Sequence, residues 1–120
     1  ERWGAVQMQN RFYKQAGRWM NDVDYSSWLA VRTVGEAVTR ANKVEPAEVK
    51  KYILSDRFSL AGFKGVKLTF RRWNQQLRQP VLLATPRSIV SVLPLKEFLH
   101  PRTYLDTLGY DKLESTCELR

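Results

Sequence analysis

Apolar positions in the first half of the chain recur at helical spacing, most clearly between Asp24 and Arg40. One apolar stripe follows steps of three and four residues and consists of Trp28, Val31, Gly35 and Val38. Other apolar residues widen this stripe towards an all-round apolar surface, so the predicted helix needs cover on more than one side. We expect Asp24 to cap its start. The helix is expected to end near residues 42–44.

Two further helices are predicted on either side of this segment. The first spans residues 2–17 and ends at Gly17, because glycine adopts the left-handed conformation at low cost. The connection after it contains Trp19 and Met20, which we expect to pack against the core. The third helix opens at Pro46, where the missing N–H of proline does no harm.

After residue 57 the pattern changes from helical spacing to alternation. Apolar and polar residues alternate at 66–71, which predicts a half-buried strand. Apolar runs at 80–85 and 89–93 predict two more strands, and this spacing favours a three-stranded antiparallel meander. The chain alone is thus predicted to be α+β, with a helical part at 1–57, a strand meander at 58–95 and an irregular surface tail at 96–120.

Composition changes this picture only a little. The chain has 120 residues and is 43% hydrophobic, which suits one folded domain. Its apolar runs are much shorter than the roughly 20 residues of a membrane span. It begins at Glu1 without Met, so we expect a mature or truncated piece. The net charge of +8 permits an anionic partner, but the positive charges are spread evenly, which favours an ordinary basic protein.

Candidate catalytic and metal-binding residues are few. His100 is the single histidine and precedes Pro101 in a predicted loop, so a capping or surface role is expected. Cys117 is the single cysteine, and it is either a free thiol or one half of a bridge to something outside the chain. A metal site at these two residues would need further ligands that do not cluster near them. We therefore predict a protein that is not an enzyme and that has no cofactor or metal.

One basic cluster allows an alternative function. Cationic side chains alternate with an aromatic ring at Arg71, Arg72, Trp73 and Arg78. Such a pattern suits single-stranded nucleic acid, because charge follows the phosphates and rings stack on bases. An exposed hairpin loop explains the same residues more simply. A small basic α+β nucleic-acid-binding module is kept as the alternative hypothesis, and an enzyme built around His100 is a weaker third.

Three segments, the helix at Asp24–Arg40, the run from Pro46 to Leu54 and the run from Leu60 to Gly65 that leads into Leu68-Thr69-Phe70, together resemble the C-terminal part of a known family. This family is the type I periplasmic substrate-binding proteins of ABC transporters. Further strings are Phe98-Leu99-His100-Pro101 and the two most specific ones, Trp73-Asn74-x-Gln76-Leu77-Arg78-Gln79-Pro80 and Leu105-Asp106-Thr107-Leu108-Gly109. These strings, with Trp3-Gly4-Ala5, are similar to the branch associated with PQQ-dependent alcohol oxidation. The resemblance covers nearly all of the chain. It implies the C-terminal part of a two-lobed α/β fold that binds its ligand in the cleft between the lobes.

The resemblance also implies roles for particular residues. Tyr25, with Asp22 and Asp24 behind it, corresponds to a segment that approaches the ligand cleft in relatives. The central helix would pack on a sheet from the missing N-terminal part, and Cys117 could bridge to a cysteine there in an oxidising periplasm. The implied function is periplasmic and non-catalytic solute binding. Its partners would be a small organic ligand and an ABC permease or a periplasmic quinoprotein dehydrogenase. As a fragment, the chain could also form a homodimer or swap elements.

Overall fold

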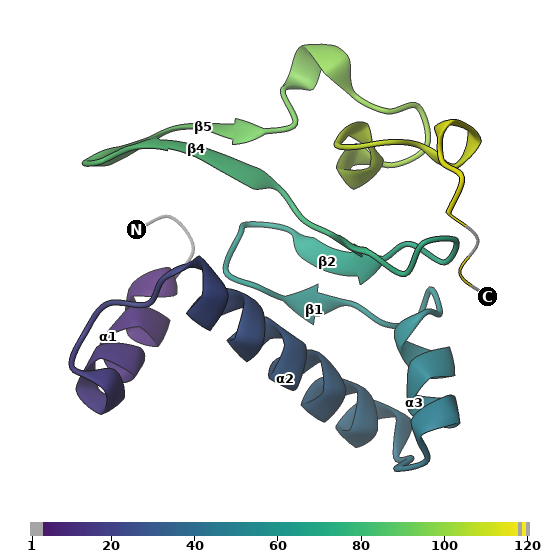
Figure 1. The fold of residues 1–120 in the computed structure, drawn as a ribbon, viewed down its shortest axis with the longest axis horizontal. Coiled ribbons are helices and arrows are strands. Elements are labelled where there is room, and N and C mark those ends of the chain that lie inside the picture. Colours follow the sequence, from purple (N-terminus) through teal and green to yellow (C-terminus); the bar gives the residue numbers. More distant parts are fainter. Residues whose placement is uncertain (1–3, 118, 120) are drawn as a thin grey trace. The chain divides into compact units, whose positions relative to one another are not determined.

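The computed structural model describes residues 4–117 and 119 and divides the chain into two compact units, Glu1–Lys67 and Leu68–Arg120. The first unit contains the helices α1 (Ala5–Ala16), α2 (Asp22–Ala41) and α3 (Pro46–Ile53) and the short strand β1 (Leu60–Ala61) (Figure 1). Strand β2 (Lys67–Phe70) begins at the boundary, and the second unit adds β3 (Leu77–Arg78), β4 (Val81–Thr85) and β5 (Ser88–Leu93). The predicted α+β class is confirmed.

Helix α1 ends as predicted. Gly17 has a positive φ of 68° and donates its N–H to the carbonyl of Tyr13 at 2.9 Å. The prediction of a packed Trp19 is wrong, because this side chain is 61% exposed and its ring lies against Tyr13 with centroids 4.9 Å apart. Residues 2 and 3 of the predicted helix, including Trp3, lie outside the described residues.

The start of α2 differs from the prediction. Asn21, not Asp24, is the N-cap, and its side chain accepts the N–H of Asp24 at 3.0 Å. The Asp24 carboxylate in turn accepts the N–H of Asn21 at 2.9 Å, which completes a capping box. The helix therefore begins at Asp22, two residues before the predicted cap. It ends at Ala41, where Asn42 adopts the left-handed conformation, close to the predicted end.

The buried face of α2 is also not the predicted stripe. The buried residues are Leu29, Thr33 and Ala37, which recur at steps of four, whereas Val31 is 75% exposed. The Thr33 hydroxyl is satisfied inside the helix, because it donates to the carbonyl of Leu29 at 2.8 Å. Gly35, which belongs to the predicted stripe, faces open space, so among the described residues no other backbone approaches it closely. Periodicity alone could not choose a face, since apolar residues occur all round this helix.

Two alanine substitutions test this assignment of faces. Leu29→Ala should lower the free energy of unfolding by about 2–4 kcal/mol, because it removes a buried side chain and leaves a cavity. Val31→Ala should change it by less than about 0.5 kcal/mol, because that side chain is exposed. Urea unfolding followed by far-UV circular dichroism measures both. Equal losses in the two variants would contradict the assigned face.

Helix α3 begins at Pro46 as predicted and packs against α2, with Val49 buried. The segment after it contributes two of the most buried side chains of the first unit. Phe58 and Leu60 are each only 1% exposed, and the ring of Tyr52 meets Phe58 edge-on with centroids 5.9 Å apart. The core of this unit therefore extends beyond its helices into residues 58–60, which the sequence pattern assigns to the start of the strand meander.

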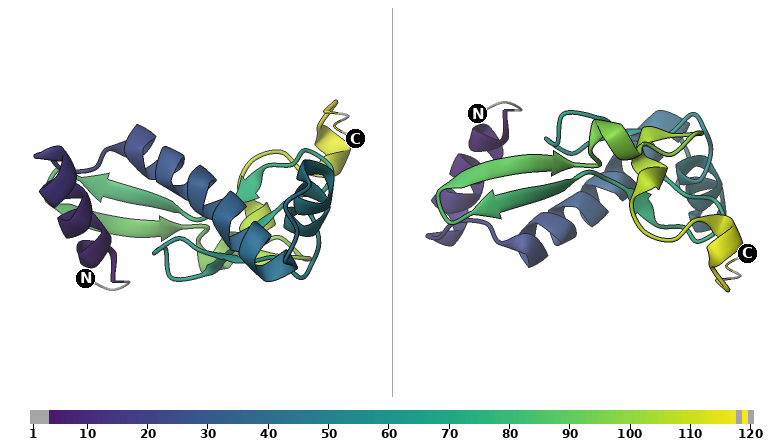
Figure 2. Two further views of the ribbon diagram at one scale, coloured as in Figure 1. Left: turned by 90° about the horizontal axis from the view of Figure 1, so that it is seen from below. Right: turned by 90° about the horizontal axis from the view of Figure 1, so that it is seen from above.

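The strands of the second unit do not form the predicted meander. All three predicted strands exist, but β2 pairs with the additional strand β3. Strands β4 and β5 form a separate antiparallel sheet, the green hairpin in Figure 2. The reason lies at Asn74–Gln76, where Gln75 has a φ of 58° and the Asn74 carboxamide accepts the N–H of Gln76 at 3.1 Å. This tight turn sends the chain back along β2 before β4 begins.

The tail is irregular, as predicted, but it is held by three short 3₁₀ helices at Lys96–Phe98, Tyr104–Thr107 and Lys112–Glu114. Leu105 in the second of these is buried, so the tail is not wholly a surface loop. Among residues 4–117 and 119, no helix is both long enough and apolar enough to cross a membrane.

Candidate functional site

Tyr25 lies in the first turn of α2 and ties this helix to the turn around Gly62. Its hydroxyl donates to the Gly62 carbonyl at 2.6 Å, and its ring lies 5.9 Å from that of Trp28. The ammonium of Lys64 sits 5.0 Å from the ring centroid, a cation–π contact. Burial raises the pKa of Tyr25 and lowers that of Lys64. The phenol is thus held neutral in a half-buried setting beside a cation.

The two aspartates of the predicted ligand segment have different surroundings. Asp22 acts by its charge on Lys64 and partly offsets the lowering of the lysine pKa. Asp24 instead forms a two-pronged ion pair with Arg18, with Arg18 Nη2 donating to Asp24 Oδ1 at 2.8 Å. The structure therefore groups Asp22 with Tyr25 through Lys64, and it commits Asp24 to Arg18 and to the cap of α2.

The Asp24 carboxylate should make the start of α2 sensitive to acid. The hydrogen bond from Arg18 and then that from the Asn21 backbone lower its pKa from 3.8 to about 2. Because the folded-state pKa is the lower one, the stabilisation is complete above about pH 4 and is lost as the pH falls towards 2. A carboxyl NMR titration should give Asp24 a pKa of about 2, and Arg18→Gln should move it upward. An unchanged value in Arg18→Gln would contradict the assigned cause.

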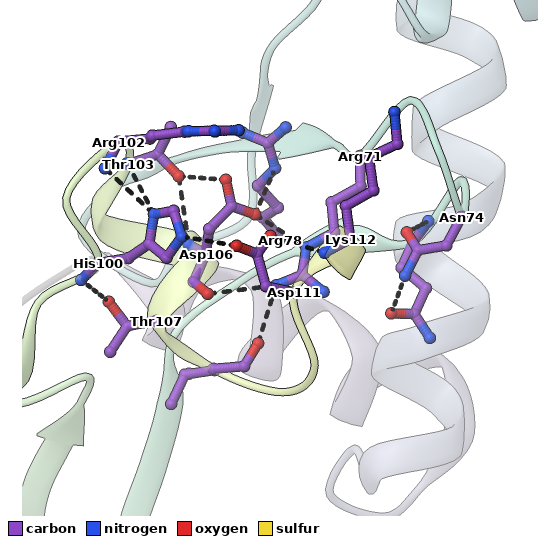
Figure 3. Close-up of polar contacts among 12 residues, drawn as sticks. Arg71, Asn74, Arg78, His100, Arg102, Thr103, Asp106, Thr107, Asp111 and Lys112 are labelled. Atoms are coloured by element: carbon purple, nitrogen blue, oxygen red, sulfur yellow. Dashed lines mark hydrogen bonds and ion pairs between the residues drawn. The ribbon is translucent and has the colours of Figure 1, made fainter. Parts of the chain in front are cut away.

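In the second unit, Arg71 is the centre of a buried polar cluster (Figure 3). It follows strand β2 and is only 5% exposed. Its Nε donates to Asp106 Oδ1 at 2.8 Å. Its terminal nitrogens donate to the carbonyls of Tyr110 at 3.0 Å and Leu108 at 2.9 Å. One guanidinium therefore ties the end of a strand to both a carboxylate and the backbone of the tail.

Asp106 is the shared acceptor of this cluster. It also forms an ion pair with Arg78, at 3.2 Å from Nε, and accepts a short hydrogen bond from the Thr103 hydroxyl (Figure 3). The Arg78 Nε contact has the distance of an ion pair without the alignment of a hydrogen bond. Burial raises the pKa of Asp106, but the bonds from Thr103 and Arg71 and the charge of Arg78 outweigh it and hold the pKa below its usual value. The carboxylate is therefore ionised at neutral pH.

These contacts affect the alternative nucleic-acid surface. Arg71 and Arg78 point their charge at Asp106, and the ring of Trp73 lies 5.6 Å below the guanidinium carbon of Arg71. Arg72 is exposed. The three arginines thus do not present their charges on one common surface, because Arg71 and Arg78 are paired with Asp106 inside the second unit.

His100 has a capping role of the kind expected from its sequence context. Its Nδ1 accepts the backbone N–H of Arg102 at 3.1 Å, so the proton of the neutral ring belongs on Nε2, which lies 3.1 Å from Asp111 Oδ2 (Figure 3). Asp111 also accepts the N–H of Lys112 at 2.7 Å, and this bond, followed by the His100 contact, lowers the pKa of Asp111. Both ring nitrogens of His100 are therefore occupied within the tail.

Nothing in the described part of the chain resembles a metal centre. Residues 4–117 and 119 contain no group of three or more His, Cys, Asp or Glu side chains placed to hold a metal ion. Cys117 is exposed and has no disulfide partner among these residues.

Comparison with protein-family models, with curated proteins and with solved structures finds no match for this chain.

Proposed function

We propose that this chain is the C-terminal part of a type I periplasmic solute-binding protein, without catalytic activity, from the branch linked to PQQ-dependent alcohol oxidation. The proposal starts from the sequence strings that resemble this family. It assigns the chain to a larger two-lobed α/β fold that binds a small organic solute. The partners would be an ABC permease or a periplasmic quinoprotein dehydrogenase.

The observation that supports the proposal best is the second apolar face of α2. Val31 and Val34 are 75% and 53% exposed, on a helix that already buries Leu29 and Ala37 on another side. A surface helix of a small domain normally needs only one apolar stripe. Two such faces are typical of a helix covered by a second layer, and the family fold would supply that layer as a parallel sheet from the rest of the protein.

The positions of the two most specific strings also support a non-catalytic function. Arg78 belongs to the first string and Asp106 to the second, and the two residues meet in an ion pair. Thr107, from the second string, accepts the backbone N–H of His100 at 2.8 Å. Residues that carry the resemblance are thus engaged with one another. This arrangement suits strings that maintain a fold more than strings that act on a substrate.

The ligand segment of the proposal is the start of α2. The Tyr25 hydroxyl donates to Gly62, so its oxygen still has acceptor capacity for a ligand donor. Lys64 and Asp22 lie in the same region and would supply one charge of each sign. We assign Tyr25 as the first contact residue, with Asp22 next to it, and Asp24 as a residue that positions this segment through Arg18.

Fractionation of source cells tests the proposal directly. An antibody against this chain should detect a polypeptide clearly longer than 120 residues, and it should detect it in the periplasmic fraction. A cytoplasmic marker protein probed on the same blot controls for leakage. A band at the size of this chain, or a longer band found only with the cytoplasmic marker, would overturn the proposal.

A further inference from the structure

A concave basic surface lies between the end of α2 and one face of α3, within the first unit. The hollow has a volume of about 290 Å³. Its charged lining consists of four cations and one carboxylate: Arg40, Lys43, Lys51, Arg57 and Glu48. The hollow is separate from the segment around Tyr25 to which solute binding is assigned above, and the inference drawn from it does not rest on that function.

The local sequence explains why these cations converge. Asn42 ends α2 in the left-handed conformation, and only a short connection separates it from Pro46, so Lys43 stays close to α3. On α3, Glu48 and Lys51 are three residues apart, a spacing that lies along one helix face, and Ser55 follows shortly after the helix ends. Packing of α3 against α2 brings this face opposite Arg40.

The two arginines of the hollow are held in place by the protein itself. Arg40 Nη2 lies 2.7 Å from Glu36 Oε2, and its Nη1 donates to the carbonyl of Ser59 at 2.7 Å. The guanidinium of Arg57 lies over the ring of Tyr52, with 5.7 Å between its carbon and the centroid. Both groups are thus oriented without a ligand, which reduces the entropy lost when an anion binds.

The lysines supply charge that the protein does not neutralise. Neither Lys43 nor Lys51 has an ion-pair partner among residues 4–117 and 119, and both are exposed along the rim. Cations gathered in a concave surface raise the local positive potential and concentrate anions there. Glu48 offsets one of the four cationic charges and Glu36 offsets that of Arg40, so the two lysines remain in excess. The carbonyls at the end of α2 also favour cations, but the charge of the two lysines exceeds the partial negative charge of one helix end.

We propose that this hollow binds a small phosphate-bearing anion of the pyrophosphate or phosphomonoester class. Phosphate groups fit this lining because arginine forks and lysine point charges are the side chains that proteins use for them. A monocarboxylate would leave most of these cations unmatched. The Tyr52 ring and Ala41 form an uncharged part of the wall, against which the rest of a phosphomonoester can pack.

Titration with sodium pyrophosphate tests the site, with the full chain and NMR amide shifts as the readout. We expect saturable shifts at Lys43, Lys51 and Ser55. Lys51→Gln should weaken binding about tenfold, because it removes one charge-assisted hydrogen bond. Combining it with Arg57→Gln should abolish binding. The matched control is Lys14→Gln, which makes the same charge change at an exposed position of α1 and should leave the affinity unchanged.

Two results would overturn the proposal. The first is an absence of saturable shifts in the unmodified chain, whose fold is checked by its amide spectrum. The second is an equal loss of affinity in Lys14→Gln and Lys51→Gln, because that result indicates diffuse attraction to a basic protein. Flotation with phosphatidylcholine vesicles that contain phosphatidic acid identifies the source of the phosphate. If the chain floats with these vesicles and Lys51→Gln abolishes the flotation, the phosphate belongs to a lipid headgroup. If the chain binds pyrophosphate but does not float, the phosphate belongs to a free compound.

Discussion

Arg71→Met is expected to lower the free energy of unfolding of the second unit by about 3–5 kcal/mol, among the largest effects of any single substitution. The guanidinium is 5% exposed and satisfies Asp106 together with the carbonyls of Leu108 and Tyr110. Methionine has a similar length and fills much of the same space. The expected loss therefore comes from leaving a buried carboxylate and two carbonyls without their donor.

Denaturant unfolding followed by the resolved indole N–H NMR signal of Trp73 measures this loss, because the ring of Trp73 lies beside the guanidinium. The matched control is Arg87→Met, the same substitution at an exposed position of the β4–β5 turn, which should change stability by less than about 0.5 kcal/mol. Arg71→Lys keeps the charge but loses the fork, so it should recover only part of the stability. Similar losses at Arg71 and Arg87 would contradict a structural role for Arg71.

The charge contribution can be separated from the packing contribution with Asp106. If the cost of Arg71→Met comes mainly from the unpaired carboxylate, the double variant Arg71→Met/Asp106→Leu should lose less free energy of unfolding than the sum of the two single variants. Arg78 remains as a partner of Asp106 and makes the coupling smaller than for an isolated pair. Strict additivity would indicate that the carbonyl contacts, and not the ion pair, account for the effect.

The parts of the fold that the sequence predicted are those set by local chemistry. Gly17 ends α1 because it needs a positive φ, and Pro46 opens α3 because its fixed φ suits a first turn. The cap of α2 was placed at Asp24, since an aspartate before an apolar run is a strong signal. Asp24 does take part in the cap, as the third helical residue of a capping box whose N-cap is Asn21. The sequence therefore indicates the right residue at the wrong position of the cap.

The parts that failed depend on contacts between distant segments. Helix α2 has apolar residues on several sides, and only packing against other segments, α3 among them, selects Leu29, Thr33 and Ala37 as its buried face. The strand pairing failed for a related reason. The sequence indicates only an exposed hairpin loop near Trp73, whereas the tight turn at Asn74–Gln76 depends on a left-handed Gln75 that composition does not indicate.

The polar cluster of the second unit could be predicted only in fragments. Arg71 falls on the polar side of an alternating strand, so the pattern indicates a solvated side chain, whereas the structure buries it. Its partner Asp106 lies 35 residues later in a tail with no regular period. A better signal was available in the specific strings that contain Arg78 and Asp106. Their resemblance to one family singled them out, although nothing in their spacing indicated that they meet.

Phe58→Ala is expected to lower the free energy of unfolding by about 3–5 kcal/mol. The side chain is 1% exposed, and its ring is met edge-on by Tyr52 at 5.9 Å with an interplanar angle of 79°. Truncation removes the buried ring and leaves a cavity that its neighbours fill only in part. The lost aromatic pair adds to the cost. Urea unfolding followed by circular dichroism measures the change.

The matched control is Phe98→Ala, since Phe98 is 73% exposed and should lose less than about 0.5 kcal/mol. The pair has diagnostic value because neither phenylalanine belongs to a predicted helix or strand, so the sequence pattern does not indicate which of them is buried. Phe58→Leu should recover much of the loss, because it restores apolar volume at the same place. If Phe58→Ala and Phe98→Ala had the same small cost, the core of the first unit could not extend beyond its helices. The buried face of α2 would then need another partner.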